Sequence, residues 1–342
     1  MSNAPLDAGA AHAVAVTGGR GTRTQRARVG LLRALAALAT RCPTGVAGAA
    51  ADSVGELWYR ATPARAAVAR ANLRRICEHL AATGSGGARA RQAATDDAAL
   101  ERLVRAVYHH ATRTYLELLR RPAVSRELWD RLTVEHPETV DPAFEHGAAI
   151  LATMHFGSLQ VVSEVLATIS QMPVTSPMET LADPEMQRFV AELRTVGHVR
   201  IVAIGEARRE LRAALGRGEL VGIVADRDIS GGGIAVPLFG HPAPLPVGPA
   251  MLALEHDVAL HVAATRRIRG ERFAGYLITI HPAEVCAGAT TRRARVEAVL
   301  AAEARAFEHF IADAPEQWWA VFFPIWPDLG PEPRSRTGGR AA

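Results

Sequence analysis

From about residue 141 onward the chain alternates short apolar runs with segments of helical periodicity, and this alternation restricts the fold more than any other feature. Strands are predicted at residues 148–156, 174–179, 199–204 and 220–226, with helices between them at 159–169, 184–196 and 207–215. Such alternation produces right-handed crossovers around a parallel sheet with both faces covered. The sequence therefore predicts an α/β fold with a mainly parallel sheet flanked by helices.

The segments around this core complete the predicted organisation. Residues 259–268 and 272–280 are predicted as an antiparallel hairpin at one side of the sheet, because only a short turn separates them. Before the core, apolar residues recur at helical spacing among arginines, which is typical of amphipathic helices. The predicted divisions are a disordered tail (1–28), an amphipathic helical region (29–140), the α/β core (141–328) and a second disordered tail (329–342).

Basic charge is concentrated near the start of the chain. All 39 basic residues are arginines, and residues 1–80 contain 11 of them against 4 acidic residues, although the net charge of the whole chain is only +4. We expect this basic region to bind an anionic membrane surface, with solvated arginines as the alternative. No basic stripe interleaved with aromatic residues accompanies it, so nucleic acid is not an expected partner. The sequence has no run of 18 uncharged apolar residues, so no membrane-spanning helix is predicted.

Several common kinds of functional site are missing from the sequence. The three cysteines, Cys42, Cys77 and Cys286, are far apart and show no metal-binding or disulfide spacing, so no metal site is predicted and a reducing compartment is expected. The glycine-rich nucleotide motifs, the G-x-S-x-G hydrolase motif and the H-E-x-x-H zinc motif do not occur. The chemistry must therefore come from other residues.

The first candidate is His155, within the run MHFGS at residues 154–158. It lies at the carboxyl end of the first predicted strand, and ligands of open α/β sheets bind at that edge. Gly157 would end the strand and Ser158 would cap the next helix. A histidine held in the core by a backbone carbonyl is the alternative.

The second candidate is the run Asp226-Arg227-Asp228, at the end of the fourth predicted strand and followed by a glycine loop. Two carboxylates and an arginine beside a histidine-bearing strand end are suited to holding a substrate that carries a hydroxyl or an anionic group. The alternative is an ordinary turn closed by an Asp–Arg pair.

Two apolar segments follow. Residues 236–253 are braced by prolines and lead into a helix, which suits either a groove for a lipid chain or core packing. Residues 314–326 contain three of the five tryptophans, a cluster that we expect to close the core rather than to contact a membrane.

The order of these motifs resembles the bacterial lipid A and phosphatidylinositol mannoside acyltransferase family. The resemblance covers about residues 30–328 and rests on GAAILATMHFG at 147–157, Glu179, ADRD at 225–228, PLFG at 237–240, PVGPA at 246–250 and APEQW at 314–318. The D-R-D and G-P-A details are closer to the phosphatidylinositol mannoside branch than to the lipid A branch.

This resemblance implies an O-acyltransferase at the cytoplasmic face of the membrane, bound peripherally. It would use acyl-CoA or an acyl-carrier protein as donor, a lipid or glycolipid hydroxyl as acceptor, and no other cofactor. The implied roles are a general base (His155), its orienting partner (Gln160), substrate-binding residues (Ser158, Glu179, Asp226, Arg227 and Asp228) and an acyl groove (Phe156, Phe239 and Pro249).

The sequence departs from the family pattern at three polar positions. Gln160 stands where the family has an acid, and a glutamine can orient an imidazole but brings no charge. Thr180 and Ala235 replace an arginine and an acid of the mannoside branch. Two further interpretations therefore stay open: a lipid-binding homologue without catalysis, and an acyltransferase retargeted to a hydroxyl or amine of a specialised metabolite.

Overall fold

The computed structural model describes residues 20–140, 143, 147–169, 172–195, 199–269 and 271–329. Most of the two predicted tails, the predicted boundary at residue 141 and the end of the helix predicted to reach residue 196 lie outside these ranges. Within them, the predicted α/β architecture is confirmed.

The core is a seven-stranded sheet in the order β1-β9-β8-β2-β5-β3-β4. Its strands are β1 (Leu132–Val134), β2 (Ala149–Thr153), β3 (Val174–Met178), β4 (Val199–Ala203), β5 (Leu220–Val224), β8 (Leu260–Ile268) and β9 (Arg272–Ile280). Strands β8, β2, β5, β3 and β4 are parallel, whereas β9 runs antiparallel to β8 and pairs in parallel with the short edge strand β1. The predicted hairpin at one side of the sheet is thus confirmed, and β1 extends it.

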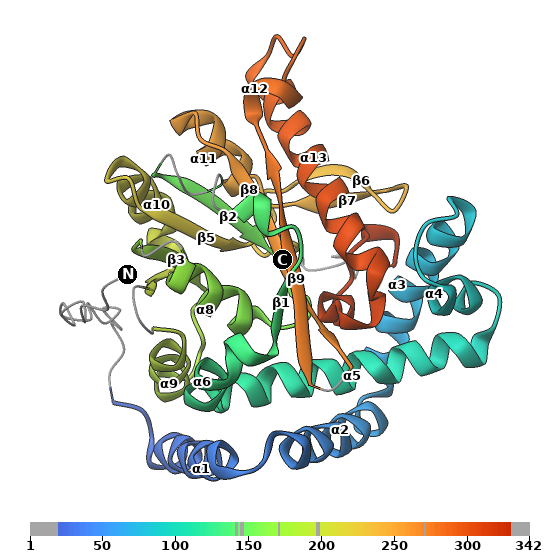
Figure 1. Ribbon diagram of the computed structural model, residues 1–342, viewed down its shortest axis with the longest axis vertical. Helices are drawn as coiled ribbons and strands as arrows, with labels where there is room; N and C mark the ends of the chain where they lie inside the picture. Colours follow the sequence, from blue (N-terminus) through green and yellow to red (C-terminus); the bar gives the residue numbers. More distant parts are fainter. Residues whose placement is uncertain are drawn as a thin grey trace, which may run out of the picture.

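Helices cover both faces of the sheet, as Figure 1 shows. One face carries α6 (Arg121–Arg131), α8 (Leu159–Ile169) and α9 (Pro184–Arg194), and the other carries α10 (Ala207–Gly216), α11 (Gly248–His256) and α13 (Arg292–Asp313). All five residues of β2 are buried. Ile150 and Ala152 belong to the cluster that includes α13, whereas Leu151 packs with α8, because successive side chains of a strand point to opposite faces.

The segment predicted as a proline-braced groove forms a separate hairpin, β6 (Ile234–Leu238) and β7 (His241–Leu245). Phe239 and Gly240 make its turn with positive φ angles. The hairpin packs on α13, and Trp326 donates its indole hydrogen to the Leu238 carbonyl oxygen at 3.2 Å. The core-packing alternative therefore describes this segment better than the groove.

The N-terminal region consists of α1 (Arg23–Arg41), α2 (Thr44–Ala61), α3 (Pro63–Ala82), α4 (Ala88–Ala93) and α5 (Asp97–Leu119). The long helix α5 crosses the carboxyl edge of the sheet, and α1 and α2 form an outer layer beneath it (Figure 1). Helix α1 begins six residues before the predicted boundary at residue 29. The reason is local, since Thr22 and Gln25 form a capping box that starts the helix.

Candidate functional site

His155 and Asp226 form a pair at the carboxyl edge of the sheet. They follow the neighbouring strands β2 and β5, whose register sets Thr153 opposite Val224. The His155 Nδ1 atom lies 2.7 Å from Asp226 Oδ1, and the His155 backbone N–H donates to Asp226 Oδ2 at 2.9 Å. A carboxylate can only accept, so Nδ1 carries the proton and Nε2 of the neutral ring keeps its lone pair. His155 is thus oriented to accept a proton.

Asp226 is fully buried, yet it is held in its charged form. The Trp318 indole donates to Asp226 Oδ2 at 2.7 Å, in addition to the two bonds from His155. Burial by itself would raise the pKa of Asp226, but the nearby His155 and these hydrogen bonds lower it. The ionised carboxylate can therefore stabilise a positive charge on the histidine ring.

The segment after α13 also contacts the loop that carries His155 after β2. It contains two 3₁₀ turns, Pro315–Gln317 and Trp319–Phe322. Trp318 and Phe156 form an antiparallel bridge, and the Trp319 backbone N–H donates to the His155 carbonyl oxygen at 2.9 Å. The Trp319 ring stands edge-on to the His155 ring, with 4.4 Å between centroids. The predicted core-closing role is confirmed for Trp318 and Trp326, which are buried, whereas Trp319 borders the candidate base.

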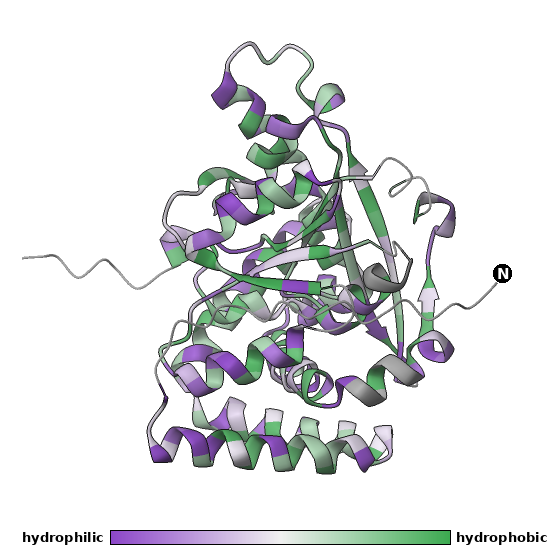
Figure 2. Ribbon diagram, turned by 90° about the vertical axis from the view of Figure 1, so that its left-hand side faces the viewer, coloured by the Kyte–Doolittle hydropathy of each residue, from purple (hydrophilic) through white to green (hydrophobic). Residues whose placement is uncertain are grey.

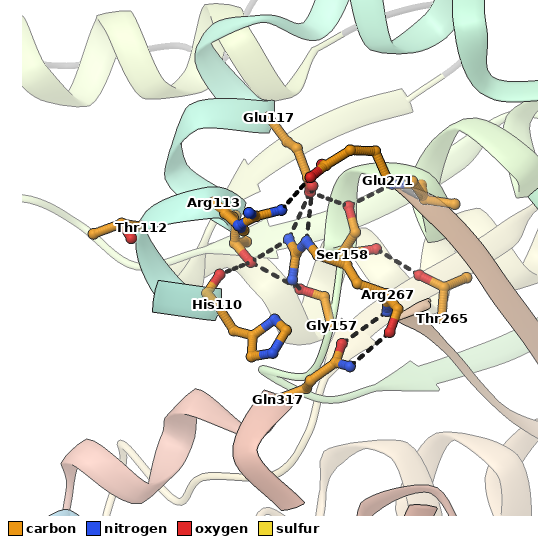
Figure 3. A network of polar contacts seen from close by, with 12 residues as sticks. His110, Thr112, Arg113, Glu117, Gly157, Ser158, Thr265, Arg267, Glu271 and Gln317 are labelled. Carbon is orange, nitrogen blue, oxygen red and sulfur yellow. Dashed lines mark hydrogen bonds and ion pairs between the residues drawn. The ribbon is translucent and has the colours of Figure 1, made fainter. Parts of the chain in front are cut away.

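A buried network fixes the same loop to α5 and β8 (Figure 3). Arg267 of β8 binds both oxygens of Glu117 at 2.9 and 2.7 Å and donates to the Gly157 carbonyl oxygen at 3.0 Å. Ser158 donates its hydroxyl to Glu117 at 2.6 Å. The Gln317 side chain exchanges two hydrogen bonds with the Arg267 backbone, at 2.8 and 2.9 Å. A buried charge is stable only when it is paired in this way, so the network sets the loop position closely.

Comparisons with known proteins show the family to which the chain belongs. A profile of the bacterial lipid A biosynthesis acyltransferases matches residues 93–324. The chain belongs to this family. It is also similar to the phosphatidylinositol mannoside acyltransferase of Mycolicibacterium smegmatis, with 28% identity over 243 residues that cover 69% of this chain and 76% of that protein. The corresponding protein of Mycobacterium tuberculosis is 27% identical over 236 residues, covering 67% and 72%. Family membership implies an acyl donor and a lipid acceptor as substrates.

The structure places Gln160 away from the role that the family resemblance implied. No hydrogen bond joins it to His155 among the described residues, and its amide nitrogen is buried there without a partner. Gln160 lies in the first turn of α8, which begins at Leu159. The position beside His155 Nδ1 belongs to Asp226, which the sequence analysis had treated as a substrate-binding residue.

Three other predicted substrate-binding residues, Ser158, Asp228 and Glu179, have different surroundings in the structure. Ser158 is fully buried and donates its hydroxyl to Glu117, so it fixes the loop. Asp228 accepts hydrogen bonds from Ser230, Gly231 and Gly233, and thereby shapes the glycine loop. Glu179 is exposed directly after β3, at the same edge of the sheet as His155.

The predicted acyl-groove residues are part of the packed core. Phe156 and Phe239 are almost completely buried, and Pro249 is buried at the start of α11. Phe239 stands edge-on to the His79 ring, at 5.7 Å between centroids. Because these side chains already fill the core, they do not line an open groove in this structure.

Sequence reasoning missed one ionisable group close to the pair. Glu303 of α13 is fully buried, and within the described part of the chain neither carboxyl oxygen has a hydrogen-bond partner. Burial raises the pKa of Glu303 well above its ordinary value, and the charge of Asp226 raises it further. Burial therefore favours the protonated, neutral form of Glu303. The available signal was a glutamate flanked by small residues, in the run LAAEARAF at residues 300–307.

The buried Glu303 predicts a specific dependence of stability on pH. A raised pKa means that the folded state binds this proton more tightly than the unfolded chain does, so stability falls as the pH rises above about 4.5. Glu303→Met should remove this decline and raise the free energy of unfolding at pH 8 by about 1–3 kcal/mol, since it also removes an unsatisfied buried carboxyl. Urea unfolding at pH 5 and pH 8 measures both effects. Equal slopes with pH in the two proteins would contradict the assignment.

Gly157 gives a second prediction, because the loop passes very close to β8. Its φ angle is +51°, and a Cβ atom would lie 1.7 Å from the Thr265 carbonyl oxygen. Gly157→Ala should lower the free energy of unfolding by about 2–4 kcal/mol through strain and steric overlap. Gly84→Ala is the matched control, because Gly84 has a φ of +70° and open space around its Cβ position. The control should cost about 1 kcal/mol. Equal melting temperatures for the two variants would show that β8 moves to accommodate the added methyl group, which would contradict the prediction.

Proposed function

We propose that this chain is a peripheral membrane acyltransferase that moves a fatty acyl group from a thioester to a hydroxyl of a glycolipid or related lipid. The observation that carries the proposal is the His155–Asp226 pair, which presents a free Nε2 at the edge of the sheet where ligands of this fold class bind. Membership of an acyltransferase family supports the reaction type.

The proposed reaction makes use of this geometry. Nε2 of His155 removes the proton of the acceptor hydroxyl while that oxygen attacks the thioester carbonyl carbon. The ring is then an imidazolium, and the ionised Asp226 stabilises its charge through Nδ1. When the tetrahedral intermediate collapses, the carbon–sulfur bond breaks and the thiolate takes the proton from Nε2. The products are the acylated lipid and a free thiol, and His155 is neutral again.

Membrane binding is proposed on an exposed apolar surface next to the site. Large hydrophobic residues that are 47–67% exposed lie on α1 and α2, namely Leu31, Leu35, Leu38, Val46, Val54 and Leu57. We call this set the outer apolar face. Figure 2 shows hydrophobic residues on this outermost helical layer, at the bottom of the view. Among the described residues, no helix has the length and apolar character required to cross a bilayer.

Four other exposed hydrophobic residues lie toward the same side. Leu181, Ile204 and Ile229 follow β3, β4 and β5, and Ile268 ends β8, so all four are at the carboxyl edge of the sheet with His155. Arginines at the ends of the outer helices, such as Arg23 and Arg41, add positive charge. An apolar surface with basic borders is suited to insertion at an anionic lipid interface.

The His155–Asp226 pair predicts rate effects of very different size for two substitutions. Asp226→Asn should lower the rate of acyl transfer by about 10³–10⁴, because an amide no longer enforces the reactive tautomer or stabilises the imidazolium. Gln160→Ala is the matched control and should change the rate less than about tenfold, since no hydrogen bond joins Gln160 to His155 among the described residues. The measurement uses a labelled acyl thioester and a lipid extract, with the product identified by mass, and melting temperatures confirm the fold.

Two results would count against this mechanism. If Gln160→Ala is as damaging as Asp226→Asn while both remain folded, the partner implied by the family spacing is the working one. If the wild-type protein transfers no acyl group from any thioester, the non-catalytic lipid-binding interpretation becomes the better account.

The outer apolar face predicts a mode of membrane attachment. The triple variant L31S/L35S/L38S should lose most binding to vesicles that contain anionic lipid, because three apolar side chains would no longer insert. Wild-type binding should resist moderate salt for the same reason. Cosedimentation with vesicles at low and high salt measures both.

The control removes charge from the opposite end of the molecule. Helix α13 begins beside α12 (Pro282–Val285), far from α1 (Figure 1), and its first residues include Arg292, Arg293 and Arg295. Changing these three to serine should leave binding nearly unchanged. If the arginine variant loses binding and the leucine variant keeps it, attachment is electrostatic. If the leucine variant instead abolishes a dimer seen by ultracentrifugation, the outer apolar face is an interface between copies of the chain.

A further inference from the structure

The side chain of His155 is mostly covered, although it lies at the edge of the sheet where ligands of this fold class bind. It is only 17% exposed. Asp226 lies 2.7 Å from Nδ1, and the ring of Trp319 stands edge-on to the imidazole with 4.4 Å between centroids. Trp319 therefore covers part of the imidazole that Asp226 leaves open.

Trp319 is held in this position from two sides. Its backbone N–H donates to the His155 carbonyl oxygen at 2.9 Å, which joins the two residues through the main chain. On the other side, the buried Asn72 of α3 donates its amide to the carbonyl oxygens of Val321, at 2.9 Å, and Phe323, at 2.8 Å. Buried hydrogen bonds of this kind restrict the movement of the segment that they hold. The Trp319 ring is therefore a fixed part of the site.

The same ring also leads toward the solvent. Tyr115 of α5 lies 6.0 Å from Trp319 between ring centroids and is 49% exposed. Trp319 is partly buried, but its indole nitrogen is completely covered and has no hydrogen-bond partner among the described residues. Tryptophan usually turns this N–H toward water or an acceptor. Trp319 instead packs its polar edge against other groups, between the imidazole and an exposed ring.

Water would compete with the lipid hydroxyl for the candidate base. Nε2 of His155 can take a proton from water as it does from an alcohol, and the water oxygen would then bond to the thioester carbonyl carbon. As the carbon–sulfur bond broke, the thiolate would recover the proton from Nε2, leaving a free fatty acid and a thiol. Enzymes suppress such side reactions by excluding water from the reacting atoms.

We infer that Trp319 is a positioning residue that keeps water from Nε2 of His155, so that the acyl group passes to a hydroxyl and not to water. The inference deepens the proposed acyltransferase function and rests on it, since this exclusion matters only where a thioester reacts at His155. An indole is suited to the role, because it covers a wide area with an apolar surface and does not titrate. It acts through the histidine and takes no part in bond making.

The first experiment measures access to His155 without turnover. Diethyl pyrocarbonate modifies the free nitrogen of a neutral imidazole, and mass spectrometry of the peptides gives the rate at each histidine. W319A should increase the rate at His155 about tenfold, whereas W319F, which keeps an aromatic ring, should change it less than about threefold. His136, whose side chain is 66% exposed, is the internal reference and should react equally in all variants. Equal rates at His155 in W319A and the wild type would overturn the inference.

The second experiment measures where the acyl group goes. With a labelled acyl thioester and a lipid extract, the ratio of free fatty acid to acylated lipid should rise about tenfold in W319A and stay within about threefold of the wild type in W319F. W129A is the matched control, because Trp129 of α6 is 48% exposed and lies on a face of the sheet, away from its carboxyl edge. This control should leave the ratio unchanged.

The ratio separates water exclusion from a purely structural role. Loss of packing alone would slow transfer and hydrolysis together, so an unchanged ratio in a slower W319A would overturn the inference while leaving the proposed function in place. Faster modification of His155 in W319A, in a protein that transfers no acyl group, would keep the cover over the histidine and contradict the proposed function. If melting temperatures show that W319A is unfolded, W319L gives the same comparison, because leucine retains apolar packing but is too small to cover the imidazole.

Discussion

The buried, ionised carboxylate of Asp226 is the interaction on which the candidate site depends. It accepts three hydrogen bonds, two from His155 and one from Trp318, and so joins the ends of β2 and β5 to the segment after α13. A charge without solvent is tolerated only when its acceptors are satisfied, which makes the positions of these donors mutually dependent. The glycine turn at residue 157 and the Arg267–Glu117 pair then fix the loop that carries the histidine.

The molecule has a consistent order of layers on one side. The carboxyl edge of the sheet holds the histidine, α5 and the aromatic rings of Tyr115 and Trp319 lie beside it, and α1 and α2 form the outermost layer (Figure 1). Under the proposed function, a lipid acceptor in a membrane would approach from this side, with its hydroxyl at His155. The outer apolar face would then contact the bilayer, while His155 would contact the hydroxyl of the acceptor.

Much of the core could be predicted because its signals are local. Strand and helix periods located most elements of the core within a few residues. The short strand β1 was missed, since three residues carry no period. Helix α6 lies within the helical region predicted for residues 29–140, but its own bounds were not predicted, because its polarity is mixed. The start of α1 was also missed, because a capping box is polar and the search relied on apolar spacing.

By itself, the sequence determined the fold class, the position of His155 and Asp226 at strand ends, and the family resemblance, because each depends on residues close together along the chain. Tertiary structure alone decided which acid meets the histidine, since Asp226 is 71 residues from His155 and reaches it through the neighbouring strand. It also decided that Glu303 is fully buried, where burial and the charge of Asp226 raise its pKa. Burial and convergence between separate elements create these properties, and no spacing along the chain encodes them.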